Sequence, residues 1–180
     1  MGVSSRPNED SKLIACALAI LLLSGMTFAQ APATAVPQFA EHEAAQGFIG
    51  TPAVPQMNTS NAKRFHTVIR EGTAKGPNFD GHYTVVEWGC GAGCAQFSIV
   101  DAVTGKVYDP PFPSVAFVSG DGRFIQNSGI RYQLDSSLLV ISGCPGGKHC
   151  AEWYYEWTGS TLKLVEKRPV KMVRPVGSPQ

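Results

Sequence analysis

Short apolar segments bounded by Gly, Asp or Pro follow one another from residue 82 onward, and this pattern predicts β-strands. The clearest case is AEWYYEW, residues 151–157, where three aromatic residues at odd positions alternate with Glu152, Tyr154 and Glu156. Such a strand has one face on a core and one in solvent. Segments rich in β-branched and aromatic residues predict strands at 82–88, 96–101, 115–119, 138–142, 151–157 and 161–166.

One segment before the strands has helical periodicity instead. In SNAKRFHTVIRE, residues 60–71, Ser60 is the expected N-cap, and Phe65, Val68 and Ile69 share one helix face. The sequence therefore predicts a mainly β (α+β) fold. We expect an antiparallel meander of short strands, in a curled sheet or two packed sheets, with one N-terminal helix. Parallel β-α-β units are excluded because no helix-length segment separates the strands.

The N-terminus has the organisation of a secretory signal. An apolar run, residues 13–26, follows a polar start that contains Arg6 and Lys12. The run is shorter than the ~20 apolar residues that cross a bilayer. Thr27 and Ala29 fit the −3 and −1 positions of a signal-peptidase site. We expect a signal peptide at 1–29, cleaved near Ala29, with an uncleaved anchor as the alternative. The mature protein would be periplasmic or secreted in a bacterium, with no transmembrane segment.

Composition divides the rest of the chain into three parts. Residues 30–60 are rich in Ala, Pro, Gln and Thr and predict a flexible leader. Residues 61–167 are long enough to bury one core and predict a β-rich domain. Residues 168–180 predict a flexible basic tail, either solvated or in contact with anionic lipid or peptidoglycan.

The mature chain carries almost no net charge. Residues 1–29 hold two basic and two acidic residues, so their removal leaves 13 Lys and Arg against 12 Asp and Glu. A protein that binds nucleic acid needs a basic face to neutralise phosphates. We therefore expect no nucleic-acid partner.

Removal of Cys16 with the signal leaves four cysteines, and an even number in an exported chain indicates two disulfides. The first two lie in EWGCGAGCAQ, residues 87–96. A zinc site would need reduced thiols, and a redox pair is more usually C-x-x-C at a helix N-terminus. A phosphate cradle would need a following Lys-Ser/Thr. We favour a disulfide-stapled turn, and we expect no metal and no cofactor.

The chain also aligns with itself at a shift of 54 positions. Over residues 85–108, six of 24 aligned positions are identical, and these include a Gly-Cys pair and a Thr-Gly pair. Both halves read as strand, Cys-loop-Cys, strand, Thr-Gly turn, strand. This self-similarity indicates a duplicated hairpin unit.

The repeat bears on the disulfide pairing. Four cysteines allow three pairings. Chain entropy favours long-range bridges, at ~4 kcal/mol each against ~2 for local closure. In the repeat, however, each unit carries its own Cys-loop-Cys between two strands. We therefore predict the disulfides Cys90–Cys94 and Cys144–Cys150.

Candidate chemistry is sparse. Neither H-E-x-x-H nor G-x-S-x-G is present, and we assign no catalytic residue. His82 is a candidate binding residue, and with Asp80, Asp101 and Glu87 it would form an acid–base group if the four lay in one cleft. The other two candidate binding residues are Lys148 and His149, which follow the glycines of the second cysteine loop.

Residues 76–109, GPNFDGHYTVVEWGCGAGCAQFSIVDAVTGKVYD, resemble a motif block of small secreted bacterial proteins that have no assigned activity. This resemblance implies a bacterial envelope protein and carries over no catalytic residue. Two shorter stretches are similar to bacterial lysozyme inhibitors: SGIRY, residues 128–132, and the loop CPGGKHC, residues 144–150. The downstream lysine-glycine segment of one inhibitor family and the His-Asp pair of the other have no match here.

Three hypotheses follow. The first is a non-catalytic envelope or binding module of unknown ligand. The second is an inhibitor of an extracellular enzyme such as lysozyme, and the third is a hydrolase-type enzyme. The expected partners are accordingly an envelope protein or an extracellular enzyme.

Overall fold

The structure is a computed structural model of the 180-residue chain and describes residues 1–2 and 35–174. The expected signal peptide, apart from its first two residues, lies outside the described residues, as does the end of the expected tail from 175 onward. Contacts divide the chain into two units, Met1–Ala35 and Val36–Gln180. No helix in the described ranges is long and apolar enough to cross a membrane.

Two short helices stand where the sequence predicts one: α2, Ser60–Arg64, and α3, His66–Thr73. They separate at Phe65, whose backbone is not helical and whose ring packs 4.8 Å from the ring of Trp88. The N-cap is Thr59 and not Ser60, since the Thr59 hydroxyl accepts the backbone N–H of Ala62. The expected apolar face is only partly buried, with Ile69 covered and Val68 36% exposed.

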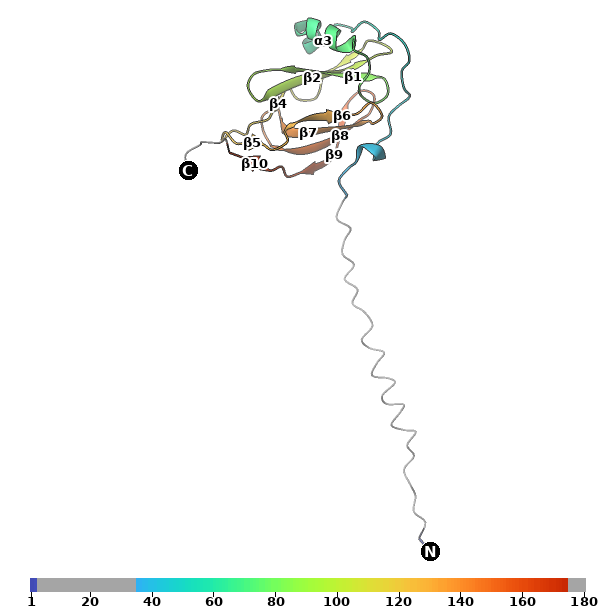
Figure 1. The fold of residues 1–180 in the computed structure, drawn as a ribbon, viewed down its shortest axis with the longest axis vertical. Coiled ribbons are helices and arrows are strands. Elements are labelled where there is room, and N and C mark those ends of the chain that lie inside the picture. The colour runs from blue at the N-terminus through green and yellow to red at the C-terminus, as the bar shows by residue number, and fades with distance from the viewer. Residues whose placement is uncertain (3–34, 175–180) are drawn as a thin grey trace. The chain divides into compact units, whose positions relative to one another are not determined.

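Ten strands form the rest of the described part of the chain, which is mainly β (Figure 1). A 3-10 turn, η1, at Phe39–Glu41 precedes the helices. The strands are β1 Tyr83–Gly89, β2 Cys94–Asp101, β3 Val107–Tyr108, β4 Val115–Ala116, β5 Phe124–Ile125, β6 Gly129–Tyr132, β7 Leu138–Pro145, β8 Ala151–Trp157, β9 Leu162–Arg168 and β10 Met172–Val173.

Eight of these strands form one open sheet in the order β1-β2-β4-β7-β8-β9, with β3 beside β2 and β6 beside β7. Strands β5 and β10 form a second, two-stranded sheet. Every strand pair in the described region is antiparallel, as the sequence predicts. The expected curled sheet or pair of packed sheets is replaced by this large open sheet and one small ribbon, because β4 pairs with both β2 and β7 and joins the two hairpins edge to edge.

The main apolar cluster takes side chains from both halves of the large sheet. Phe97 and Ile99 of β2 join Leu139 and Ile141 of β7, together with the aromatic face of β8. The alternation in β8 holds in part: Tyr155 and Trp157 are buried and Trp153 packs against the same cluster, but Tyr154, expected on the solvent face, is buried in another cluster with Leu138 and Val140. Figure 1 shows β1 and β2 between α3 and the strands β6–β9. A smaller cluster between the helices and the sheet contains Ile69, Val86 and Val100.

The leader expected to be flexible is bound to the domain over residues 39–56. Backbone N–H groups of Ala44 and Phe48 donate to Asp135 and Gly81, and those of Ala53 and Gln56 donate to residues 102 and 105. Prolines do prevent a long helix here, but extended chain can still bond to neighbouring backbone. The start of the expected tail is also bound, because Met172–Val173 pairs with β5.

The two halves of the predicted repeat have the same local form. In each, an antiparallel hairpin is closed by a disulfide, and a turn with a positive-φ glycine leads to a third strand beside the second. These glycines are Gly105, at φ 75°, and Gly159, at φ 81°. The units are therefore β1-β2-β3 and β7-β8-β9, which supports the duplication.

Candidate functional site

The two disulfides are Cys90–Cys94 and Cys144–Cys150, as predicted. Both lie against β4, where Ala116 pairs with Cys94 on one side and with Cys144 on the other. Strands in a sheet are about 4.8 Å apart, so these two cysteines stand roughly 10 Å from each other. Because β2 begins at this level and β7 ends just beyond it, the two cysteine loops leave β4 in opposite directions along the strands. The two loops therefore start close together but extend away from each other.

The first loop is closely held by its own backbone and by the segment after β4. The N–H of Cys90 donates to the carbonyl of Cys94, and Phe117 N–H donates to Gly93 O over 2.7 Å. Gly93 has φ 66°, and a Cβ there would lie 2.7 Å from a methyl of Val118. This position therefore needs glycine for both reasons.

The second loop is pinned at its base and exposes its two candidate binding residues. Gly147 N–H donates to Cys144 O over 2.9 Å, and Gly146 N–H donates to Ser114 O over 2.8 Å. Lys148 and His149 are exposed, and neither side chain makes a hydrogen bond or ion pair within the described residues. Hydrogen bonds to the rest of the fold thus hold the base of this loop, and its tip remains exposed.

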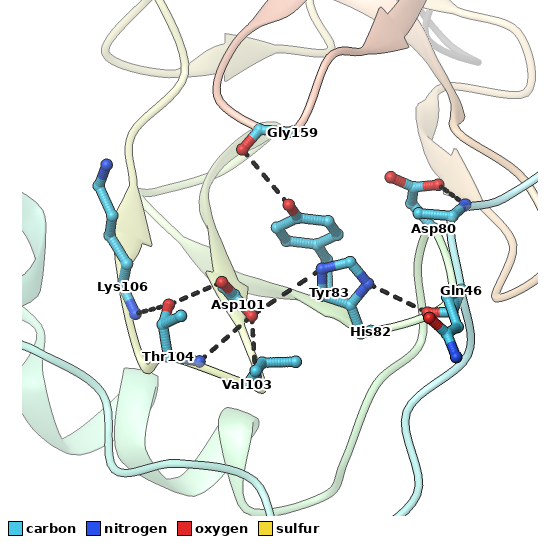
Figure 2. A network of polar contacts seen from close by, with 10 residues as sticks. Gln46, Asp80, His82, Tyr83, Asp101, Val103, Thr104, Lys106 and Gly159 are labelled. Atoms are coloured by element: carbon cyan, nitrogen blue, oxygen red, sulfur yellow. Dashed lines mark hydrogen bonds and ion pairs between the residues drawn. The ribbon is translucent and has the colours of Figure 1, made fainter.

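His82 lies just before β1 at the centre of a polar network (Figure 2). Its Nδ1 is 3.2 Å from the carbonyl oxygen of Gln46. A carbonyl only accepts, so Nδ1 carries the proton in this hydrogen bond. Its Nε2 is 4.0 Å from Oδ1 of Asp101. The ring is thus held by the leader on one side and faces a carboxylate on the other.

Asp101 is the last residue of β2 and leads into the turn that follows. Its Oδ1 accepts the backbone N–H groups of Val103, at 2.8 Å, and Thr104, at 3.3 Å. Its Oδ2 accepts the Thr104 hydroxyl at 2.6 Å. A carboxylate bonded in this way shapes the turn, which is a common role of Asp at such a position.

Asp80 also has a structural partner. It is 4% exposed, with φ 41°, and its Oδ1 accepts the N–H of Ala45 over 2.7 Å. Burial raises the pKa of Asp80 above its ordinary value, and the Ala45 hydrogen bond and the nearby His82 act in the opposite direction. Asp80 and His82 thus both fasten residues 44–49 to the start of β1.

Glu87 does not join this group. It lies five residues along β1, which at about 3.3 Å per residue places it roughly 16 Å from His82. Its Oε1 accepts the phenol of Tyr132 over 2.9 Å. Loss of water around the carboxyl raises the pKa of Glu87, and the Tyr132 hydrogen bond offsets part of that rise. The expected acid–base group of four is therefore reduced to Asp80, His82 and Asp101.

Other residues of the NFDGHY stretch, 78–83, are also structural. The Asn78 amide exchanges two hydrogen bonds with the backbone of Val85 and so replaces a neighbouring strand at the edge of β1. Phe79 is fully buried. Gly81 has φ 74°, and a Cβ there would overlap the carbonyl oxygen of Ala45. The motif holds the leader against the sheet.

Two hollows flank this leader segment. One, of about 460 Å³, is lined by Gln46, Gly47, Phe48, Ile49, His82 and Val103. The other, of about 600 Å³, includes Phe48, Lys75, Pro77, Leu134 and Asp135. The sequence pattern did not indicate either, because the leader reads as unstructured and its contacts join residues far apart in the chain.

A second polar network that the sequence did not indicate lies on β6, β7 and β8. The carboxylate of Glu152 accepts hydrogen bonds from Arg131, from the Ser142 hydroxyl at 3.1 Å and from the Tyr154 phenol at 2.6 Å. Burial alone would raise the pKa of Glu152, but these hydrogen bonds together hold it below its ordinary value. The sequence pattern assigned Glu152 only to the polar face of β8 and did not predict these partners.

Within the described residues, no group of three or more His, Cys, Asp or Glu side chains is arranged to hold a metal ion. Comparison with known proteins found no matching family, no matching curated protein and no matching solved structure.

Proposed function

We propose that this protein is a periplasmic or secreted, non-catalytic module that binds a protein partner through residues 145–149, the second cysteine loop. The observation that carries the proposal is the free tip of this loop. Lys148 and His149 are exposed, while a disulfide and two backbone hydrogen bonds hold the loop beneath them. A rigid loop loses little conformational entropy on binding, so its side chains are suited to recognition.

The compartment is part of the same proposal. Two disulfides are compatible with an oxidising location outside the cytoplasm. The signal-like sequence at residues 1–29 adds an export route. Together they support a bacterial envelope or secreted protein.

A hydrolase-type enzyme is supported less well. An acid–base group needs side chains that are available to a substrate. Asp101 is bonded within its turn, Asp80 holds Ala45, and His82 holds Gln46 through Nδ1. These contacts account for Asp80 and for Nδ1 of His82 by the attachment of the leader, and for Asp101 by the shape of its own turn.

Inhibition of an extracellular enzyme is the second candidate. It is favoured by the same loop, because a closed loop with a free Lys-His pair has a shape that can enter a cleft in another protein. The separation of the two cysteine loops leaves the second loop to act alone. Addition of the purified protein to lysozyme and to other secreted hydrolases, with residual activity as the readout, tests this candidate directly.

The partner-binding proposal is tested with matched variants. The purified protein is immobilised, a bacterial envelope fraction is passed over it, and the dissociation constant of each retained protein is measured. Lys148→Ala with His149→Ala should weaken binding by about fivefold or more, as expected for loss of a contact worth at least about 1 kcal/mol.

Lys63→Ala with His66→Ala is the control, because it removes one exposed lysine and one exposed histidine from the helices. This variant should bind as the wild type does. Equal binding by the wild type and the loop variant would contradict the proposal.

A further inference from the structure

The hollow beside His82 has a composition that none of the roles above explains. Its walls are apolar and unusually exposed, with Ile49 fully exposed and Val103 at 58%. Phe48 adds a third apolar side chain. Exposed apolar groups gathered around a hollow are a common feature of ligand sites.

At the polar end of the hollow, the ring of His82 stands beside the carboxylate of Asp101. Because Nδ1 of His82 donates to Gln46, Nε2 of the neutral ring keeps its lone pair. The Nε2 atom faces Oδ1 of Asp101 at 4.0 Å, which is too long for a direct hydrogen bond. One donor nitrogen placed about 2.9 Å from both atoms would fit between them, with an angle near 90° at the nitrogen.

The surrounding charge favours a cation there. The carboxylates of Asp101 and Asp80 flank His82 (Figure 2), and among the described residues that line the hollow His82 is the only basic one. The nearest lysine drawn in the network, Lys106, places its ammonium 4.8 Å from the ring of Tyr108. An ammonium group would thus meet two acceptors and negative charge.

We propose that this hollow binds a small primary amine with an apolar body. The ammonium donates to Nε2 of His82 and to Oδ1 of Asp101, and the hydrocarbon part lies against Phe48, Ile49 and Val103. The hollow, at about 460 Å³, is within the size range of small-molecule sites.

The test compares three probes of equal length: n-hexylamine, 1-hexanol and hexanoate. Binding to the purified protein is measured by calorimetry and by the shift of the His82 ring signals in NMR spectra. Hexylamine should bind about tenfold or more tightly than hexanoate, as a charge-assisted hydrogen bond implies. Hexylamine should also move the His82 signals. Equal affinity for all three probes, or no binding of hexylamine, would overturn the proposal.

Two variants test where the amine binds. His82→Asn keeps an N–H for Gln46 and removes the Nε2 acceptor, so hexylamine affinity should fall about tenfold. Val103→Ser should weaken hexylamine and hexanol alike by removal of an apolar wall, whereas Val165→Ser, an exposed valine on β9, should change neither. If His82→Asn releases the leader, the test rests on Val103→Ser. Unchanged hexylamine binding by Val103→Ser would also overturn the proposal.

Discussion

The phenol of Tyr132 on β6 donates a 2.9 Å hydrogen bond to the carboxylate of Glu87 on β1, 45 residues earlier in the chain. These strands are not neighbours in the sheet, so the bond joins its two halves. The residue Glu87 keeps more than a third of its surface exposed, yet nearby protein removes enough water to raise the pKa of its carboxyl. The pair therefore combines a structural link with a titratable group.

Tyr132→Phe should raise the pKa of Glu87 further, because the phenol O–H stabilises the charged carboxylate. A carboxyl whose pKa is higher in the folded state binds more protons there than in the unfolded state. Stability therefore falls as pH rises from the ordinary value of 4.5 through the raised pKa. The part of the fall that comes from Glu87 should be larger in Tyr132→Phe and absent in Glu87→Gln, which keeps the contribution of Asp80. NMR titration of Glu87 and denaturation across this pH range measure both effects, and a lowered pKa in Tyr132→Phe would contradict the assignment.

Lys148→Ala with His149→Ala should leave stability within ~0.5 kcal/mol of the wild type, as is usual for exposed side chains. Trp157→Ala is the contrasting variant. Trp157 is 5% exposed in the main cluster, and its loss should cost ~3–5 kcal/mol. Urea denaturation measures both changes. Unfolding of the double variant would mean that the loop tip is part of the core and not a free surface.

The two disulfides should differ in their response to reductant. Cys90 is exposed and Cys94 half-buried, whereas Cys144 is 1% exposed. Attack by a thiolate requires access to sulfur, so Cys90–Cys94 should open first. Timed alkylation after limited dithiothreitol treatment, followed by mass spectrometry, gives the order. Earlier labelling of Cys144 and Cys150 would show that the second loop opens more readily than its burial implies.

Gly81→Ala should destabilise the protein more than Gly147→Ala. Both glycines have similar positive φ values, 74° and 71°, so each substitution carries a backbone cost of about 1–2 kcal/mol. A Cβ at Gly147 meets nothing within 4 Å, whereas one at Gly81 overlaps backbone of the leader and should add ~1–3 kcal/mol. Chemical denaturation gives the difference, and faster proteolysis within residues 44–49 should accompany it. Equal costs would mean that the leader is not held at Gly81.

Local sequence was enough to predict the features whose partners lie close together in the chain. The β1-β2 and β7-β8 hairpins and their disulfides all depend on contacts within about 20 residues. Turn glycines and strand alternation encode such contacts directly. The exposed tip of the second loop follows from the same local pattern.

Tertiary structure alone decided the position of the leader, the function of β4 and the environment of each polar candidate. Residues 39–56 have no hydrophobic period, and the backbone hydrogen bonds that attach residues 44–56 go to residues 33 or more positions away, as from Phe48 N–H to Gly81 and from Ala44 N–H to Asp135. Strand β4 has only two residues, too few to show alternation, yet it joins both halves of the sheet. Likewise, the sequence grouped Glu87 with His82 by residue type, but an extended strand separates the two. The β1-β2 register, which pairs Tyr83 with Asp101, brings Asp101 to His82 instead.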